Sequence, residues 1–505
     1  MHVERQIAPS SQWKGDAVLY LAFEGTAEPL PGFRQWMDRH APWLPASTAF
    51  RDFEGKYQQA AVFYGPPDGI VSRVICAGLG TADTFQLDKL RGAAASAFRK
   101  CRDLHLSTVT LPVAAFEGLP LETGTAVEEF IIAGLTSLHR LDAFKTRDVE
   151  PAVHPERLVV TSEQETDDFL SATIENAQAL SSGICMARDL VAAPANRVTP
   201  LYLADSARCL AQSHGFQLHV IDMEEARNLD MGAFLAVAQG SREPACMIVL
   251  EHAPAGCEET PPLVFIGKGI TFDTGGISLK PSSKLDSMKQ DMAGAAAVLG
   301  AFEAIGRMGV KQRVVGILPC TENMPDGKAY KPGDVIRSMS GLTIEVISTD
   351  AEGRMILCDA LTYGLRYSPA AVVDIATLTG ACIIALGHQV AAVLGNREGF
   401  VRKIMETGIK LGERLWQLPL WDFYFEDLKS EIADMKNVGD RSAGTIVGAI
   451  FLQQFVPPDV PWAHMDIAGT AWAEKDQGAV PKGATGFGVR TLVELARRWA
   501  EMKTA

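Results

Sequence analysis

Charged residues that could carry out chemistry are concentrated in two short stretches of the chain, residues 267–280 and 346–355. The rest of both stretches is glycine, threonine, serine and apolar residues, which makes a poor solvated surface. The charged members are Lys268, Asp273, Lys280, Asp350, Glu352 and Arg354. We interpret the two stretches as parts of one active site.

A fourth carboxylate, Asp291, stands directly before a run of small residues over 292–298, which predicts a helix that packs closely under the site. Four carboxylates in one place would repel one another unless cations neutralised them. Two divalent metal ions would do so, and paired metals polarise a carbonyl group and lower the pKa of a bridging water in many hydrolases. Carboxylate ligands suit Zn²⁺, Mn²⁺ or Mg²⁺, and the residues leave that choice open.

The two lysines complete this interpretation. A lysine beside two metals would be driven towards its neutral amine, which can bind a metal. A second lysine that stayed charged could stabilise the oxyanion formed when water attacks a carbonyl. The alternative is that each charged residue is an ordinary ion pair at the end of a loop, but the whole set favours a metal site.

The surrounding residues predict how these side chains are brought together. Residues 262–266 are typical of a strand that ends just before Lys268, and residues 343–348 are typical of a buried strand before Asp350. Apolar residues at helical spacing over 355–367 predict a helix after the second strand. In an open α/β sheet ligands bind at the carboxyl ends of the strands, which is where these side chains would lie.

A family resemblance rests on three motifs. Residues 348–354, Ser-Thr-Asp-Ala-Glu-Gly-Arg, differ at one position from the Asn-Thr-Asp-Ala-Glu-Gly-Arg signature of the leucine aminopeptidase family, the two-metal cytosol aminopeptidases. Residues 267–281 and 288–295 are similar to the other two site motifs of that family. The resemblance implies metal ligands at Lys268, Asp273, Asp291, Asp350 and Glu352. It also implies that Lys280 polarises the scissile carbonyl and that Arg354 holds a bicarbonate acting as general base.

The resemblance extends to a substrate pocket. It implies that Met288, Thr377, Leu378, Gly380 and Ala468 line the pocket for the first substrate side chain, and that Ser348 binds substrate at a position where the family has an orienting amide. An apolar pocket containing methionine favours Leu-like side chains. Two positions depart from the family: Ser348 replaces an asparagine, and Ala192 stands where asparagine is usual. Neither change removes a ligand, so specificity is affected more than activity.

The whole-chain composition narrows the class of protein. The 505 residues carry a net charge of −14, which disfavours a general nucleic-acid partner. The nine cysteines are scattered and include no CxxC pair, which indicates a reducing cytoplasm. The amino terminus has no signal-peptide layout, and the most apolar later stretch, 370–386, contains aspartate, threonine and glycine, so no membrane span is predicted.

Strand and helix patterns alternate along the chain, which predicts a two-domain α/β protein. We predict an amino-terminal α/β domain over 1–165, a linking helix over 166–190 and a catalytic domain over 175–505 with a mostly parallel or mixed central sheet. The polar residues 151–164 are interpreted as a linker. The resemblance implies that the smaller domain is similar to macro domains and that the protein is a homo-hexamer.

The predicted function is therefore a metal-dependent aminopeptidase that releases Leu-like residues from short peptides with a free amino terminus, by attack of a metal-bridging hydroxide. One alternative is a non-catalytic or DNA-binding regulatory member of the same family. Another is a different two-metal hydrolase such as a phosphoesterase, which the lack of a glycine-rich anion cradle disfavours. The isolated His388 and His464 are interpreted as structural residues.

Overall fold

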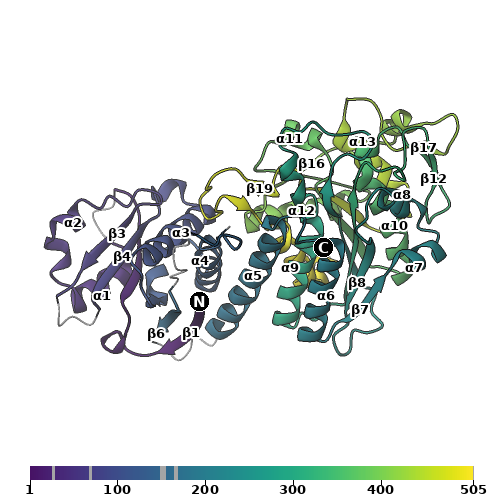
Figure 1. Cartoon of the computed structure of the whole chain (residues 1–505). Coiled ribbons are helices and arrows are strands. Elements are labelled where there is room, and N and C mark those ends of the chain that lie inside the picture. The colour runs from purple at the N-terminus through teal and green to yellow at the C-terminus, as the bar shows by residue number, and fades with distance from the viewer. Residues whose placement is uncertain (26–28, 67–70, 141, 148–154, 164–168, 504–505) are drawn as a thin grey trace. The chain divides into compact units, whose positions relative to one another are not determined.

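The computed structural model describes residues 1–25, 29–66, 71–140, 142–147, 155–163 and 169–503 (Figure 1). The chain divides into two compact units. The first contains residues 1–181 together with 474–482, and the second contains residues 182–473 and 483–505. No helix within the described ranges is long and apolar enough to cross a membrane.

The first unit is built on a six-stranded sheet with strand order β1-β6-β5-β2-β4-β3. Its strands are β1 (His2–Ile7), β2 (Ala17–Ala22), β3 (Ala60–Tyr64), β4 (Arg73–Gly78), β5 (Thr108–Pro112) and β6 (Arg157–Ser162). Only β3, at one edge, pairs antiparallel with its neighbour among these strands. The helices of this unit are α1 (Pro31–His40), α2 (Thr48–Arg51), α3 (Leu87–Asp103) and α4 (Thr123–Ser137).

Strand β6 corrects the interpretation of residues 151–164 as a linker. Residues 157–162 form parallel ladders with β1 on one side and β5 on the other, and five of the six are buried. The short Leu158-Val-Val160 run supplies the buried apolar side chains, and the polar residues on either side of it made the strand hard to predict from the sequence. Residues 151–154 and 164 lie outside the described ranges.

Helix α5 (Phe169–Ala192) begins in the first unit and ends in the second, whose main sheet has nine strands. The strand order is β16-β15-β18-β14-β9-β11-β8-β7, and β10 pairs with β11. The strands are β7 (Gln217–Ile221), β8 (Cys246–His252), β9 (Leu263–Gly267), β10 (Gly269–Asp273), β11 (Val314–Asn323), β14 (Ala371–Ala376), β15 (Ala391–Gly395), β16 (Leu415–Gln417) and β18 (Trp462–Asp466). The central strands β18, β14, β9 and β11 are parallel to one another, so their carboxyl ends meet at one edge of the sheet.

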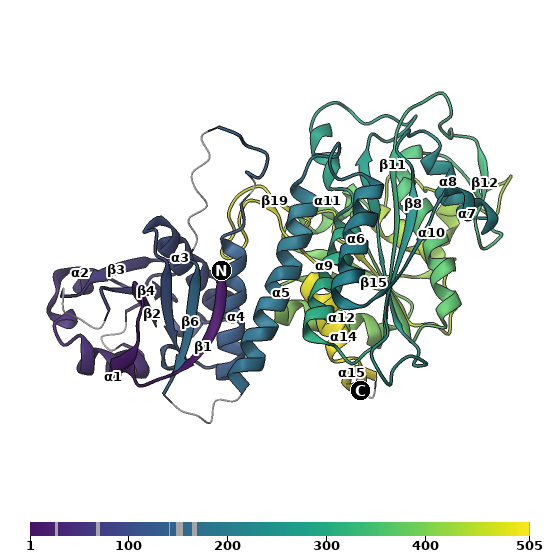
Figure 2. The ribbon, with the colours of Figure 1, turned by 60° about the horizontal axis from the view of Figure 1, so that its bottom comes forward.

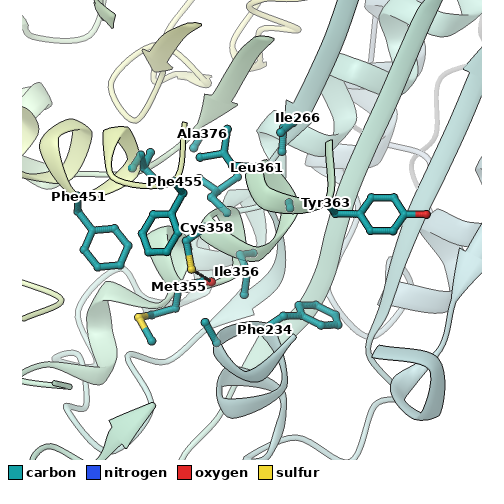
Figure 3. Close-up of a cluster of buried hydrophobic side chains, with 14 of the residues drawn as sticks. Phe234, Ile266, Met355, Ile356, Cys358, Leu361, Tyr363, Ala376, Phe451 and Phe455 are labelled. Carbon is teal, nitrogen blue, oxygen red and sulfur yellow. Dashed lines mark hydrogen bonds between the residues drawn. The ribbon is translucent and has the colours of Figure 1, made fainter. Parts of the chain in front are cut away.

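Helices cover both faces of this sheet, as Figure 2 shows. Alternate residues of β11 face opposite sides of the sheet. A side chain at Gly316 would collide with Phe302 of α9 (Ala293–Met308). The next residue, Ile317, lies against Gly364 of α10 (Glu352–Gly364) on the other face. The α10 face forms the buried apolar cluster drawn in Figure 3, which includes Met355, Leu361 and Phe451. This alternation of buried side chains is the pattern expected of a sheet covered on both faces.

The remaining helices and strands surround that framework. The helices are α6 (Pro200–His214), α7 (Met223–Asn228), α8 (Gly232–Ala238), α11 (Gly380–Leu386), α12 (Glu398–Leu411), α13 (Gly444–Gln453), α14 (Val489–Arg497) and α15 (Trp499–Lys503). A three-stranded sheet contains β12 (Val335–Arg337), β13 (Thr343–Glu345) and β17 (Met435–Lys436), and a small hairpin pairs β19 (Trp472–Ala473) with β20 (Gly483–Ala484).

The strand predicted over 343–348 is shorter than expected and lies in a different sheet. It ends at Glu345, and it pairs with β12 and β17 rather than with the central parallel strands. Ile344 is buried while its two neighbours are partly exposed, so the strand has one covered face only. Strand propensity does not specify the partner strand, which is why the sequence placed this segment in the main sheet.

Candidate active site

Close backbone packing at the start of α9 holds the centre of the site together. A side chain at Gly294 would place its Cβ 2.1 Å from the carbonyl oxygen of Ile375 in β14. The N–H of Ala295 donates to the carbonyl of Lys268, which follows β9 directly. The predicted small-residue helix therefore does pack against the carboxyl ends of β9 and β14.

Lys268 connects three segments of the chain: the turn before α9, the start of α10 and the turn after β14. Its ammonium lies 2.8 Å from a carboxylate oxygen of Asp291 and 2.8 Å from Oε1 of Glu352, the first residue of α10. It also donates to the carbonyl of Thr377, over 2.9 Å. Its side chain is almost fully buried, as are both carboxylates.

Lys280 plays the same part on the other side of the cluster. Its ammonium lies 2.7 Å from Oδ2 of Asp273, the last residue of β10, and forms a second ion pair with Asp350. Asp350 lies in a 3-10 turn over 349–351 just before α10, and it is the most exposed of the four carboxylates. Carboxylate oxygens of Asp273, Asp350 and Glu352 lie within 4.8 Å of one another, close enough to bind one metal ion together.

The electrostatics of the cluster fit a cation site. Burial and the neighbouring carboxylates raise the pKa of Asp291 to about 8, despite the attraction of Lys268. Burial likewise raises the pKa of Asp350 to about 6. Burial alone would lower the pKa of both lysines, but the surrounding carboxylates outweigh it and raise the pKa of each. Two ammonium groups do not fully relieve the repulsion among four carboxylates, and divalent ions would relieve more of it.

Asn323 is a site residue that sequence reasoning missed. Its buried side-chain amide donates to Oδ1 of Asp273 over 2.8 Å and to the carbonyl of Thr349 over 3.0 Å. It ends β11, which continues five residues beyond the strand expected from the sequence, so the local pattern does not mark it as a residue at a strand end. Asn323 also fills the space beside Gly276, because a Cβ there would lie 2.7 Å from its Oδ1.

Arg354 is buried in the first turn of α10, and Asn437 positions it. One guanidinium nitrogen donates to the carbonyl of Asn437 over 2.6 Å. The Asn437 side chain in turn accepts the N–H of Ile347 and donates to the carbonyl of Ser348, so it fixes the segment before Asp350. Among the described residues, Nε of Arg354 is buried without a hydrogen-bond partner. Burial lowers the pKa of Arg354 to about 10, although Glu352 and Asp466 oppose that shift.

The predicted pocket residues fall into two groups. Thr377, Leu378 and Gly380 follow β14 in one turn, and Ala468 follows β18, which pairs with β14. The hydroxyl of Thr377 donates to Asp291 over 2.6 Å, which connects this turn to the carboxylate cluster.

The second group flanks the cluster from other segments. Ser348 caps the turn that carries Asp350 by accepting its N–H over 3.2 Å. Met288 lies in a 3-10 turn over 285–290 that contacts β10 and leads to Asp291. The carbonyl of Ala192, at the end of α5, accepts a hydrogen bond from Lys289 over 2.6 Å, so the second departure from the family touches the segment next to Met288.

Comparison with known proteins identifies the family. The catalytic domain of the cytosol aminopeptidase family matches residues 185–493, and the amino-terminal domain of that family matches residues 42–148. The chain belongs to the cytosol aminopeptidase family. It is a metal-dependent aminopeptidase. These matches confirm the predicted family and enzyme class, and the matches to both domains confirm the two-domain α/β fold.

Individual relatives match over nearly the full length of this cytosol aminopeptidase family member. A probable cytosol aminopeptidase of Syntrophobacter fumaroxidans is 59% identical over 502 residues, which cover 99% of each chain. A probable cytosol aminopeptidase of Oleidesulfovibrio alaskensis is 46% identical over 506 residues, 98% of each chain.

Solved structures show the same fold. A tomato leucine aminopeptidase variant superposes with a TM-score of 0.86 at 31% identity, covering 98% of this chain and 96% of the other. The bottromycin maturation enzyme BotP, in a complex with Mn, gives a TM-score of 0.84 at 33% identity, covering 96% and 99%.

Proposed function

We propose that this enzyme releases Leu-like amino-terminal residues from short peptides with the help of two divalent ions, Zn²⁺ or Mn²⁺. The ions would be held by Asp273, Asp291, Asp350 and Glu352, and by Lys268 once its proton is displaced, because a metal ligand must be deprotonated. The observation that carries the proposal is that two lysines form ion pairs with four carboxylates in one cluster. These residues lie at the ends of β9 and β10, in the turn before α9, at the start of α10 and in the segments next to them.

The donor set fits such ions. Oxygen ligands predominate, and three carboxylates converge within reach of a common centre. When bound, the ions would polarise the scissile carbonyl and lower the pKa of a water towards neutrality. The BotP structure that contains Mn has the same fold as this chain, which supports Mn²⁺ as one candidate.

Lys280 is suited to bind the oxyanion that forms at the scissile carbonyl. The neighbouring carboxylates raise the pKa of its ammonium, which favours the charged form that can bind an oxyanion. About a fifth of the side chain is exposed, whereas Lys268 is almost fully covered. Of these two lysines, Lys280 is therefore the one accessible to a substrate oxygen, and a cation in that position stabilises developing negative charge without reorganisation.

Arg354 is suited to hold an anion, and bicarbonate is the proposed one. Its buried Nε needs an acceptor, and a buried cationic donor left without one is costly. Asn437 fixes the orientation of the guanidinium from the opposite side. A bicarbonate held there would supply a base that takes a proton from the attacking water.

The pocket for the first substrate side chain is proposed to lie between the turn after β14 and the turn after β18. Leu378 is partly buried against the apolar cluster of the second unit, and Ala468 lies on the other turn. Gly380 adds no side chain, and apart from its chain neighbours and its own helix backbone no atom lies within 4 Å of where its Cβ would be. An apolar wall with open space beside it suits a branched aliphatic side chain.

Two further features of the proposal rest on the family resemblance. We propose that the protein is cytoplasmic and assembles as a homo-hexamer that admits only short peptides. Light scattering after size-exclusion chromatography measures the mass of the particle directly, and a monomer would contradict the hexamer.

The decisive experiment is hydrolysis of Leu-p-nitroanilide by chelator-stripped protein before and after Mn²⁺ or Zn²⁺ is returned. Activity should return with metal in the wild type and stay absent in Asp273→Ala. A wild type that is inactive with every metal, on a panel of aminoacyl substrates, would favour the non-catalytic alternative. The DNA-binding form of that alternative has the additional obstacle of a net charge of −14, which repels a polyanion.

A further inference from the structure

Asp466 is a wholly buried carboxylate at the end of β18 that contacts both proposed walls of the pocket. Its Oδ1 accepts the N–H of Leu378 over 3.1 Å and the N–H of Ala468 over 3.2 Å. Those two residues follow different strands and are 90 positions apart in the chain. One oxygen atom therefore sets the spacing between the two walls.

The other oxygen extends the same connection. Oδ2 of Asp466 accepts the hydroxyl of Thr379 over 2.6 Å, and that hydroxyl lies 2.8 Å from the hydroxyl of Thr445 in α13. The Thr379 oxygen also accepts the N–H of Cys382 and so caps the start of α11. A single carboxylate thus joins the turns after β14 and β18 to the starts of α11 and α13.

These bonds also determine what the pocket walls present to a ligand. The amide hydrogens of Leu378 and Ala468 are directed to the carboxylate, so neither is left as a polar donor that an aliphatic side chain would have to cover. Buried N–H groups require an acceptor, and Asp466 provides one for both turns.

The carboxylate itself is held in place by its surroundings. Asp466 interacts electrostatically with Arg354 and with His464, which lies two residues earlier on the same strand. His464 is fixed by Asp374 of β14, over 2.5 Å, and Asp374 also accepts the indole N–H of Trp462 over 2.7 Å. Every member of this network except Arg354 is fully buried, so Asp466 has little freedom to move.

We propose that Asp466 is a positioning residue that fixes the width of the pocket for the first substrate side chain, and thereby the selectivity for that residue. The inference rests on the proposed function, because it concerns the same pocket. Asp466 would not touch the substrate. It would act through Leu378 and Ala468, whose backbone positions determine which side chain the pocket fits.

The test compares kcat/KM for Leu-p-nitroanilide with kcat/KM for Ala-p-nitroanilide in metal-loaded protein. In Asp466→Ala both backbone amides lose their acceptor, and we expect the Leu-to-Ala selectivity ratio to fall about tenfold, because selectivity among aliphatic side chains depends on the fit of the pocket. In Asp466→Asn one oxygen can still accept both amides, and we expect most of the selectivity to be restored.

Two further variants separate positioning from general damage. Asp359→Ala removes another fully buried aspartate that accepts two backbone N–H groups, those of Phe234 and Met339. It should lower the thermal midpoint without changing the selectivity ratio. Thr379→Val removes only the hydroxyl that links Asp466 to α11 and α13, so it should reduce the ratio a few-fold even if Asp466→Ala fails to fold, and Thr379→Ser should restore it.

A selectivity ratio unchanged in both Asp466→Ala and Thr379→Val would overturn the proposal. An equal loss of kcat/KM on both substrates would also overturn it, since that result would mean that Asp466 acts through Arg354. A wild type that hydrolyses neither substrate would contradict the proposed function itself, and this outcome is distinct from a change in the selectivity of the variants.

Discussion

The side-chain amide of Asn323 donates to Oδ1 of Asp273 over 2.8 Å, and the two residues are directly paired across the parallel strands β11 and β10. A carboxylate oriented in this way presents its other oxygen to the centre of the cluster, where Lys280 contacts it. Groups that hydrogen-bond to metal ligands commonly control metal affinity.

We expect Asn323→Ala to weaken Mn²⁺ binding by roughly 10–100-fold, the range usual for loss of such an orienting group. Isothermal titration of chelator-stripped protein measures this without relying on activity. Asn396→Ala is the control, since the Asn396 side chain accepts the N–H of Trp462 and donates to the carbonyl of Val460, away from the cluster. Equal affinities in wild type and Asn323→Ala would contradict the orienting role.

Lys280 gives the second prediction. Lys280→Ala should lower kcat for Leu-p-nitroanilide by about 10²–10³-fold, because one preorganised oxyanion donor contributes about that much. KM should change far less, since the contact strengthens only as charge develops on the carbonyl oxygen. Steady-state kinetics at saturating metal measure both constants. Lys328→Ala, at an exposed lysine, is expected to leave them unchanged, and a change confined to KM in Lys280→Ala would refute the assignment.

Gly276 gives the third prediction. It adopts a φ of +65°, and an added Cβ would lie 2.7 Å from Asn323 and 3.0 Å from Thr349. We expect Gly276→Ala to destabilise the protein by about 1–3 kcal/mol and to lower metal affinity, because the side chain must displace the group that orients Asp273.

The control for that variant is Gly215→Ala. Gly215 has a φ of +74°, but no atom lies within 4 Å of its Cβ position. Gly215→Ala introduces the same backbone strain but no steric collision, so it should lower the free energy of unfolding by about 1 kcal/mol. Urea unfolding and Mn²⁺ titration of both variants give the comparison, and similar metal affinities would show that space at Gly276 is not limiting.

Glu303, near the end of α9, gives a pH-dependent prediction outside the carboxylate cluster. Burial alone would raise its pKa, but hydrogen bonds from His214, Arg307 and Ser182 outweigh burial and lower the pKa below its ordinary value of 4.5. A carboxyl group whose pKa is lower in the folded state stabilises the protein above the unfolded-state pKa and loses that contribution as pH falls through the folded value.

We therefore expect Glu303→Gln to cost about 1–2 kcal/mol at pH 7 and less at pH 4 and below, as charge-assisted hydrogen bonds are lost. Urea unfolding of chelator-stripped protein across that pH range measures the difference. Glu398→Gln is the matched control, because Glu398 forms an exposed ion pair with Arg402 that contributes little. A cost independent of pH would show that Glu303 acts through packing and not through its charge.

Local sequence was sufficient to predict which charged residues the structure brings together. The motifs around Asp273, Asp291 and Asp350 have distinctive residue types at fixed short spacing, so the cluster could be recognised before the fold was known. The two-domain α/β organisation followed from alternating strand and helix patterns, because hydrophobic periodicity is also a local property.

The tertiary structure decided which distant groups support that cluster. Asn323, Asn437 and Asp466 are single polar residues at strand or loop ends, and each acts on a segment at least 26 positions away. Strand pairing was also beyond the sequence, as residues 157–162 joined the first sheet and residues 343–345 joined a separate small sheet. The physical reason is the same in both cases: residue type determines what a group can bond to, and only the folded path of the chain determines which partner is within reach.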